Sequence, residues 1–229
     1  MKLIKSSSKK FYLVSSFMLV FVLLTAGCKS LSSTTTLNTG EIEATEFNGT
    51  KLTSISAQNN NALAGTQNIN PATYTLTIDG LVDHPLTLTY ADLQAYPQIS
   101  QLQTLQCVEG WSFTAEWTGP SLSAIFAAAG VQPSATIAIF HTSDVPAGYT
   151  SLDLSYIENS NIIIALKDNN ITLPADRGWP FQVVSYGKYG YKWAKWVTRI
   201  ELSSNSNFSG FWESNGYNND ASVTGPAGQ

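Results

Sequence analysis

The chain has 229 residues, of which 12% are charged, and a formal net charge of −4. Four of its twelve basic residues lie within the first ten positions, so the rest of the chain has eight basic and sixteen acidic residues and a net charge of −8. This negative field excludes nucleic-acid binding through overall charge, and two cysteines with two histidines do not supply the usual ligands of a structural zinc site.

The first thirty residues have the layout of a secretory signal. A lysine-rich start precedes an apolar run from Phe11 to Leu24, which is shorter than the roughly 20 residues of a membrane-spanning helix. The following LLTAGC resembles the lipobox of bacterial lipoproteins. We therefore expect residues 1–27 to be removed and Cys28 to be lipidated, which exports the protein and anchors it to the membrane, facing the periplasm or the cell exterior. A plain signal peptide is the alternative.

Residues 28–65 are rich in Ser, Thr, Asn and Gly and show no sustained period. Such a composition predicts a flexible tether, with at most a short strand around residues 51–55. One folded domain is expected over residues 66–220, followed by a loose tail over residues 221–229.

Strands and short helices interleave from Pro71 onward without a regular alternation, which favours an α+β fold over a doubly wound one. Thr89 is predicted to cap a short helix that stops at Pro97, and Ser121 a longer helix that stops at Gly130. Strands are predicted from period-two alternation or from short apolar runs. They span residues 73–80, 84–90, 136–143, 161–167, 181–186 and 196–202.

Cys107, in TLQCVEGW, is the only cysteine after Cys28. An unpaired thiol in an oxidising compartment must be buried, bound to a metal or reactive. A cysteine hydrolase would pair Cys107 with a histidine such as His141, but no local signature supports that pair. A serine hydrolase is disfavoured because the chain has no G-x-S-x-G motif.

Five of the eight later basic residues lie between Arg177 and Arg199, among glycines and aromatic residues. Glycine lets a backbone approach a ligand closely, and lysine holds phosphate as a point charge, so this cluster predicts an anion site. Aromatic residues between basic ones also suit stacking on single-stranded nucleic acid, which the negative charge of the chain disfavours. A solvated hairpin whose aromatic residues are partly buried is the alternative.

Five blocks, in this order, resemble the molybdopterin-binding domain of the sulfite oxidase family: TLQCVEGWSFTAEWTGPSL, GYTSL, GWPFQVV, YGYKWAKWVTRIEL and GFWESNGY. The Cys-Val-Glu variant is most similar to the bacterial periplasmic protein-methionine-sulfoxide reductase branch, and the resemblance covers residues 66–218. It implies an α+β fold with mixed sheets and short helices. It also implies an oxidoreductase that performs two-electron chemistry or oxygen-atom transfer with molybdopterin and molybdenum, with tungsten as the alternative metal.

The resemblance implies roles for single residues. Cys107 matches the cysteine whose thiolate binds molybdenum, and a soft thiolate ligand explains an unpaired cysteine in an exported protein. Lys195 matches the lysine that holds the terminal phosphate of the pterin, with the backbone of Trp193 and Ala194 beside it.

Other cofactor contacts match less closely. Thr142 and Asn68 fall in regions where the family supplies polar contacts to the cofactor. The family has a phosphate-binding arginine where this chain has Gln182. Arg177 lies five residues earlier, and we expect it to take over that contact.

Substrate and partners follow from the same comparison. Glu109 and Glu116 lie near Cys107 and disfavour an anion such as sulfite, so a small S- or N-oxide or an oxidised residue is expected. The chain has no C-x-x-C-H haem motif, so electrons are expected to come from a separate partner, membrane-bound if the lipid anchor is present, and we expect a monomer. Two alternatives stay open: a cofactor-free binding or scaffold lipoprotein of this fold, and a cysteine-dependent enzyme without a metal.

Overall fold

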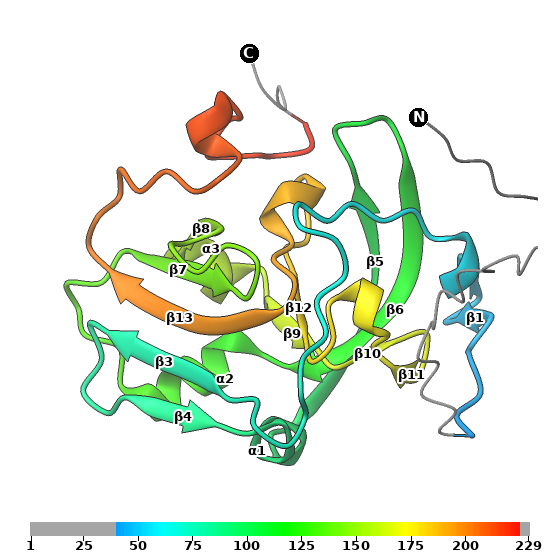
Figure 1. Ribbon diagram of the computed structural model, residues 1–229, viewed down its shortest axis with the longest axis horizontal. Coiled ribbons are helices and arrows are strands. Elements are labelled where there is room, and N and C mark those ends of the chain that lie inside the picture. Colours follow the sequence, from blue (N-terminus) through cyan, green and yellow to red (C-terminus); the bar gives the residue numbers. More distant parts are fainter. Residues whose placement is uncertain (1–39, 225–229) are drawn as a thin grey trace, which may run out of the picture. The chain divides into compact units, whose positions relative to one another are not determined.

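The computed structural model describes residues 40–224 of the chain. Within this range the helices are short, and most of the regular structure is β-strand (Figure 1). The helices are α1 (Tyr90–Ala95), α2 (Leu122–Ala129) and α3 (Leu154–Asn159), and the 3-10 turns are η1 (Ile55–Ala57), η2 (Ala175–Arg177), η3 (Gly190–Lys192) and η4 (Glu213–Asn215). The strands are β1 (Glu46–Phe47), β2 (Thr50–Lys51), β3 (Leu76–Gly80), β4 (Leu86–Leu88), β5 (Gln98–Gln106), β6 (Ser112–Pro120), β7 (Ile137–Thr142), β8 (Thr150–Asp153), β9 (Ile163–Ala165), β10 (Lys167–Asp168), β11 (Ile171–Thr172), β12 (Gln182–Val184) and β13 (Val197–Ser203).

The larger sheet has five strands in the order β4-β3-β13-β7-β8. Strand β13 pairs in parallel with β3 and antiparallel with β7, so the sheet is mixed. Strand β13, near the end of the chain, lies between β3 and β7, which come much earlier in the sequence (Figure 1). Mixed sheets with short helices are the fold class that the sequence predicted, and this prediction is confirmed.

A second sheet, of order β11-β10-β6-β5, is built on the long hairpin of β5 and β6. The turn of this hairpin lies at the top of Figure 1, on the other side of the view from the C-terminal segment in orange and red. Threonine and serine side chains pair across its exposed face, as in the 2.7 Å contact between Thr104 Oγ1 and Thr114 Oγ1. Neither strand was predicted: β5 is mostly polar and its apolar residues do not alternate with period two, whereas the alternation of Phe113, Ala115 and Trp117 in β6 was overlooked.

The predicted strands and helices after Pro71 are all present, with bounds shortened by a few residues. Thr89 accepts a hydrogen bond from the backbone of Asp92, whose side chain in turn accepts from Thr89, forming a capping box at the start of α1. Ser121 caps α2, and Gly130 ends it in the left-handed region with φ 66°. These ends are correct because capping depends on residues that are neighbours in the sequence.

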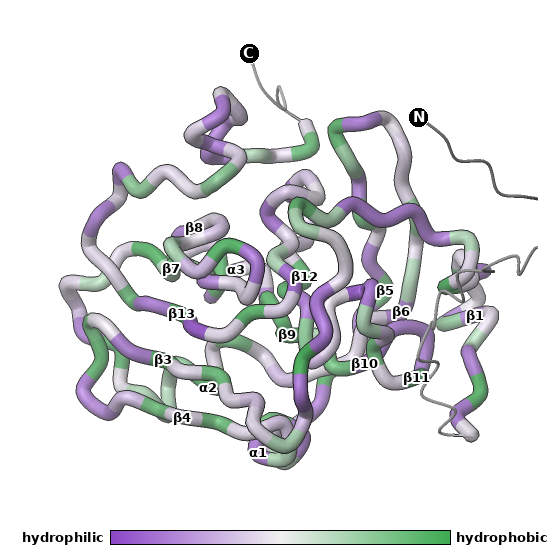
Figure 2. Tube along the Cα trace, in the orientation of Figure 1, coloured by the Kyte–Doolittle hydropathy of each residue, from purple (hydrophilic) through white to green (hydrophobic). Residues whose placement is uncertain are grey.

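Two clusters of buried apolar residues stabilise the fold. The larger lies against the five-stranded sheet and α2, and the smaller lies under the β5–β6 hairpin. Figure 2 shows the corresponding hydrophobic stretches along the strands, whereas the segment that crosses in front of β5 and β6 is hydrophilic. In the smaller cluster, Trp117 of β6 meets Trp193 edge to face with ring centroids 5.7 Å apart. This contact joins the hairpin to the segment that follows β12.

The described part of the expected tether differs from that expectation. Ala44 donates to the carbonyl of Asn169 at 2.8 Å, Thr53 donates to the carbonyl of Thr114 at 2.9 Å, and Leu52 is buried. These residues pack on the domain because strands β6 and β10 offer backbone partners, which composition alone does not reveal. At the other end of the chain, Ala221 is fully buried, although we expected a loose tail from there on.

The expected signal peptide and the expected lipidation site, Cys28, lie outside the described residues. Within residues 40–224, no helix is both long enough and apolar enough to cross a membrane.

Candidate functional site

A pocket lies where the turn between β5 and β6 meets the segment after β12 and the C-terminal end of the domain. Its empty space is about 910 Å³ when the solvent at its open side is included. Side chains from widely separated parts of the sequence line it, among them Cys107, Glu109, Arg177, Gln182, Trp193, Lys195, Trp212 and Tyr217.

The thiol of Cys107 lies at the end of the hairpin. The backbone of Cys107 donates to the carbonyl of Trp111 at 2.9 Å and accepts from Gly110 at 3.1 Å, which fixes this tight turn. Burial raises the pKa of the Cys107 thiol, and the nearby Glu109 carboxylate adds to that effect. A protonated thiol is a poor nucleophile, whereas a bound metal cation deprotonates a coordinating thiol. This environment therefore suits a metal ligand better than a free nucleophile.

The carboxylate of Glu109 is held at the mouth of the pocket. One oxygen accepts from Trp111 Nε1 at 2.9 Å, and the other accepts from Asn61 Nδ2 at 3.0 Å. Asp144 also lines the pocket. Glu109 next to the thiol, and Asp144 elsewhere in the lining, make the pocket less favourable for an anionic substrate.

Arg177 also lines the pocket and is buried, with only 6% of its surface exposed. Its guanidinium donates to the carbonyl of Asn59 at 2.7 Å and to the carbonyl of Gln58. Its Nε has no hydrogen-bond partner among the described residues, and the carboxylate of Asp176 is 3.7 Å away. An almost buried cation with mainly neutral partners retains most of its capacity to attract an anion.

Lys195 is beside it. Its Nζ donates to Asn60 Oδ1 at 2.5 Å and to the carbonyl of Asn61 at 2.6 Å, and no carboxylate within residues 40–224 forms an ion pair with it. Burial lowers the pKa of Lys195 to about 8, and the positive charge of Arg177 contributes. The Lys195 side chain packs directly on the backbone of Gly178. Only glycine fits there, because a Cβ would lie 2.9 Å from the Lys195 side chain and the φ of 107° is in the left-handed region.

Three further residues from the sequence analysis lie nearby. Gln182 is buried, lines the pocket and forms a backbone bridge to Lys195. Trp193 lines the pocket, whereas Ala194 points into the larger core and its carbonyl accepts from Val183 at 2.9 Å. The structure therefore brings together the thiol, both cations and the position where the family has an arginine.

Two of the expected contacts are not in the pocket wall. Asn68 is exposed and does not line the pocket. Thr142 is buried and donates to Asp144 Oδ1 at 2.7 Å, so it acts on the pocket through that carboxylate. His141 also lies elsewhere, bonded to the carbonyl of Pro146 at 2.9 Å, which leaves no support for a pair of Cys107 with His141.

The sequence analysis missed the asparagine run at residues 59–61. These residues line the pocket and hold both cations, although their composition is typical of a linker. It also assigned no role to Tyr149, Trp212 and Tyr217, which form an aromatic wall. The blocks GYTSL and GFWESNGY, which carry these rings, were the available signal.

Gln58, which directly precedes this run, donates a hydrogen bond to Asp168, a buried carboxyl group with a raised pKa. Asp168 is fully buried; its Oδ1 accepts from Gln58 Nε2 at 3.1 Å, and its Oδ2 has no partner among the described residues. Burial raises the pKa of Asp168 to about 7. Because the folded state then binds a proton that the unfolded state loses at lower pH, this group makes stability fall as pH rises from about 4 to 7.

We therefore expect Asp168→Asn to stabilise the protein at pH 8 by about 1–3 kcal/mol and to have less effect at pH 4. The amide stays neutral at both pH values, so the variant has no buried charge at this position at pH 8. Urea unfolding of both proteins at the two pH values measures this difference. An equal effect at pH 4 and pH 8 would contradict the proposed titration.

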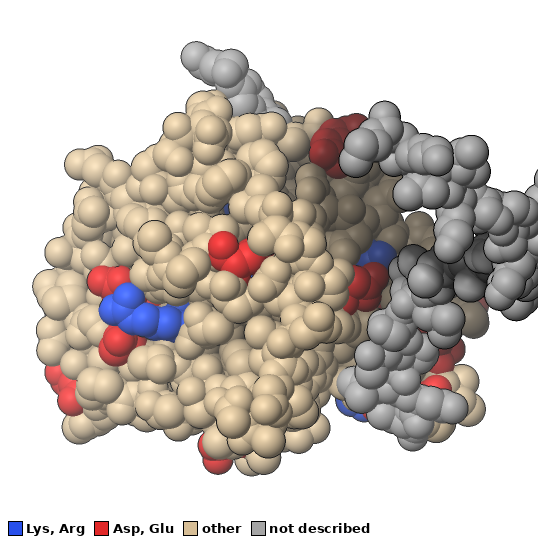
Figure 3. All heavy atoms as spheres, viewed as in Figure 1, with Lys and Arg blue, Asp and Glu red and all other residues tan. Residues whose placement is uncertain are grey.

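The pocket fits a cofactor that has a metal at one end and a phosphate at the other. It offers one thiol for a soft metal and, apart from it, the buried Arg177 and the half-buried Lys195, whose close partners are mainly neutral oxygens. Figure 3 shows that the basic side chains on the face drawn there lie beside acidic ones, so exposed charge does not explain this pair. No group of three or more metal-ligating side chains occurs in the described part of the chain, so such a metal needs ligands from a cofactor.

Comparison with known proteins agrees with this reading. Residues 63–212 match the family model described as the oxidoreductase molybdopterin-binding domain. The chain is 33% identical over 145 residues to the oxidoreductase YuiH of Bacillus subtilis, covering 63% of this chain and 72% of that protein. It is 31% identical over 152 residues to the protein-methionine-sulfoxide reductase catalytic subunit MsrP of Gluconobacter oxydans, covering 59% of this chain and 49% of that protein.

A solved structure gives the same result for the fold. The sulfane dehydrogenase SoxCD from Paracoccus pantotrophus superposes with a TM-score of 0.58 at 24% identity, over 62% of this chain and 41% of that one. The sulfite-oxidase-type fold predicted from the sequence is thereby confirmed. The chain spans about half the length of the methionine-sulfoxide reductase subunit.

Proposed function

The chain belongs to the oxidoreductases with a molybdopterin-binding domain and is therefore an enzyme that depends on this cofactor; we propose that it reduces neutral S- or N-oxides in the pocket around Cys107. The observation that carries the proposal is the presence in one pocket of an unpaired thiol, an aromatic wall and two cations whose hydrogen-bond acceptors are all neutral oxygens. A cofactor-free protein would have no evident need to place two such cations together.

In this proposal the Cys107 thiolate binds the metal, and Lys195 and Arg177 hold the phosphate of the pterin. The cofactor, when bound, supplies a metal centre that exchanges two electrons and an oxygen atom with the substrate. The chain's own residues bind the cofactor at both ends and restrict access to it. Gln182, where the family has an arginine, contributes a neutral hydrogen-bonding side chain.

The substrate class follows from the charge and apolar character of the pocket. Glu109 and Asp144 repel anions such as sulfite or nitrate, whereas the rings of Tyr149, Trp212 and Tyr217 favour a neutral thioether or amine group. The overall reaction takes an oxide, two electrons and two protons to the reduced compound and water. A methionine sulfoxide, free or in a protein, satisfies these requirements, and the similarity to a methionine-sulfoxide reductase subunit supports it.

We further propose that the protein works outside the cytoplasm as a lipid-anchored monomer. The basic start, the apolar run and the LLTAGC sequence ending at Cys28 support export and an anchor. The electrons come from a separate partner, because the sequence has no haem-attachment motif. A partner in the same membrane would meet the anchored enzyme readily.

Metal content and substrate preference test this proposal together. Protein from a host that makes molybdopterin is analysed for molybdenum and tungsten, and reduction of methionine sulfoxide, trimethylamine N-oxide and nitrate is then followed with reduced viologen. We expect bound metal and a preference of about tenfold or more for the neutral oxides over nitrate, since two carboxylates repel the anion. Folded protein without metal would favour the cofactor-free alternative, and a preference for nitrate would refute the substrate class.

Arg177→Ala tests whether this arginine holds the phosphate. Loss of one charge-assisted contact of about 1.5–3 kcal/mol weakens cofactor retention about 10- to 100-fold. Metal and pterin content after dialysis measure retention, with Arg199→Ala as the control because Arg199 does not line the pocket and pairs with Asp79 and Glu201. An Arg177→Ala protein that keeps its full cofactor would rule out this role.

A further inference from the structure

The C-terminal segment (residues 204–224) follows β13 and supplies one side of the pocket. Trp212 and Tyr217 of this segment line the pocket. Their rings meet edge to face with centroids 5.1 Å apart, and Tyr217 meets Tyr191 in the same way at 5.2 Å. The position of the segment therefore sets the shape of the pocket on this side.

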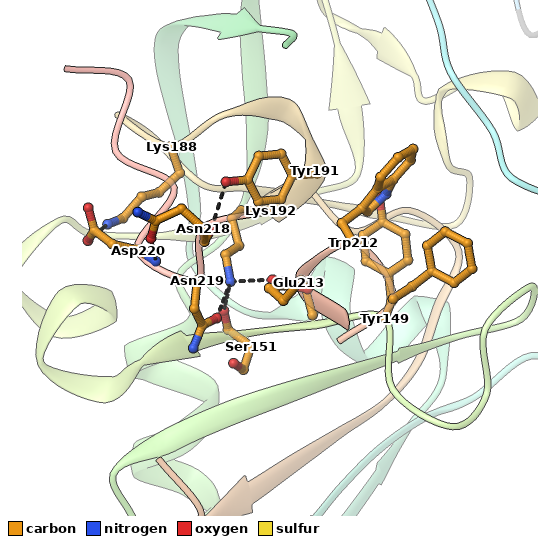
Figure 4. Close-up of polar contacts among 12 residues, drawn as sticks. Tyr149, Ser151, Lys188, Tyr191, Lys192, Trp212, Glu213, Asn218, Asn219 and Asp220 are labelled. Atoms are coloured by element: carbon orange, nitrogen blue, oxygen red, sulfur yellow. Dashed lines mark hydrogen bonds and ion pairs between the residues drawn. The ribbon is translucent and has the colours of Figure 1, made fainter. Parts of the chain in front are cut away.

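Lys192 lies beneath this segment, with only 1% of its side chain exposed. Its Nζ donates to Glu213 Oε1 at 2.5 Å, to Asn219 Oδ1 at 2.7 Å and to the carbonyl of Ser151 at 3.1 Å. Figure 4 shows the ammonium pointing into this group of oxygens. An ammonium has three donors, so all of them are used, two on the C-terminal segment and one on β8.

Glu213 is equally buried, with 3% of its side chain exposed. Its Oε1 also accepts from Thr150 Oγ1 at 2.6 Å, and its Oε2 has no hydrogen-bond partner among the residues that the structure describes. Lys192 is thus the cation that compensates this carboxylate. Removal of either charge leaves the other buried and uncompensated, which strongly favours a rearrangement that brings it to water.

We propose that Lys192 is a positioning residue: by holding Glu213 and Asn219 it fixes Trp212 and Tyr217 in the pocket wall and so sets the fit of the pocket to its substrate. Trp212 directly precedes Glu213, and Tyr217 lies between the two residues that Lys192 holds. Lys192 itself does not line the pocket and acts through these neighbours. The effect on substrate rests on the proposed function, whereas the effect on the segment does not.

An ion pair with an exposed carboxylate holds the same segment and provides a control. Lys188 Nζ is 2.7 Å from Asp220 Oδ1; the Lys188 side chain is 12% exposed and that of Asp220 66% (Figure 4). Water and salt screen a pair with an exposed member, so it contributes little to stability. In Asp220→Asn the lysine keeps the hydroxyl of Ser222 as a hydrogen-bond acceptor at 3.2 Å, so the variant removes the ion pair without leaving the ammonium unpartnered.

Hydrogen exchange of the full protein, with its cofactor as purified, tests the structural part. We expect Lys192→Met to speed exchange in residues 204–224 about tenfold or more, since the segment opens locally, while β3, β7 and β13 keep their rates. Asp220→Asn is expected to change these rates by less than about threefold. The double variant Lys192→Met with Glu213→Gln is expected to restore slow exchange, because no uncompensated charge is left.

Kinetics with methionine sulfoxide test the functional part. We expect Lys192→Met to raise KM about tenfold with kcat within about threefold, and the double variant to restore KM, which loss of packing alone would not do. Slow exchange of residues 204–224 in Lys192→Met would overturn the proposal. If that variant does not fold, Glu213→Gln decides by the same measurements. A wild-type protein that reduces no sulfoxide would refute the proposed function but leave the exchange result standing.

Discussion

Replacement of Cys107 with serine is expected to abolish the oxidoreductase activity, by a factor of about 10³ or more. A serine hydroxyl is a hard and weakly acidic group, and it does not replace a thiolate as ligand of a soft metal centre. We also expect bound molybdenum to fall from about one atom per chain to near zero, because the protein's own metal ligand is lost. Viologen-linked sulfoxide reduction and elemental analysis measure the two effects.

The other cysteine provides the control. Cys28→Ser removes the expected lipidation site but keeps Cys107, so activity and metal per chain should stay at the wild-type level while the protein leaves the membrane fraction. Iodoacetamide gives an independent readout. A ligated Cys107 should resist alkylation until the cofactor is removed, and rapid alkylation of the metal-containing protein would favour the cysteine-dependent alternative without a metal.

Lys195→Gln is expected to have the second largest effect, a loss of cofactor retention of about 30- to 100-fold at pH 7. The ammonium is the anion-binding group with no ion pair in the described structure, so its removal is not offset by another charge. Pterin fluorescence in the filtrate after dialysis measures the loss. Lys167→Gln is the control, because that lysine is 39% exposed and already pairs with Glu41 at 3.6 Å.

The pKa of Lys195 also predicts how retention depends on pH. Lys195 is charged below its pKa of about 8 and loses its charge as pH rises through that value. Because only the charged form attracts a phosphate, wild-type retention should weaken above pH 8, and Lys195→Gln should show little change over the same range. Equal pH profiles for the two proteins would show that Lys195 does not hold the anion.

Local sequence patterns predicted local structure well. The caps at Thr89 and Ser121, the end of α2 at Gly130 and the buried strands followed from residues that are close together in the chain. Strand β5 did not, because it is mostly polar and is stabilised by pairing with β6. Strand β6 has alternating buried residues Phe113, Ala115 and Trp117, so its pattern was present in the sequence but was not recognised as a strand.

The residues of the site were likewise predictable only in part. The unpaired Cys107 and the basic cluster around Lys195 were visible in the sequence, since a lone thiol and a concentration of lysines in an acidic chain are unusual. Asn68 was chosen from the same polar stretch as the asparagines at residues 59–61, but only the latter line the pocket. An asparagine run has no periodicity that indicates which residues it contacts. Its contacts with Arg177 and Lys195 depend on the path of the chain across the domain.

The sequence by itself determined the family, the charge balance and the chemical types of the groups at the two ends of the site. Only the tertiary structure decided which cations share the pocket and that residues 59–61 bind them. It also decided that Lys192 pairs with Glu213 rather than lying in the anion site. The physical reason is that burial and pairing depend on segments that lie far apart in the sequence. The five basic residues between Arg177 and Arg199 therefore have different partners. Arg177 and Lys195 line the pocket, and Lys192 pairs with the buried Glu213. Lys188 and Arg199 pair with Asp220 and Asp79.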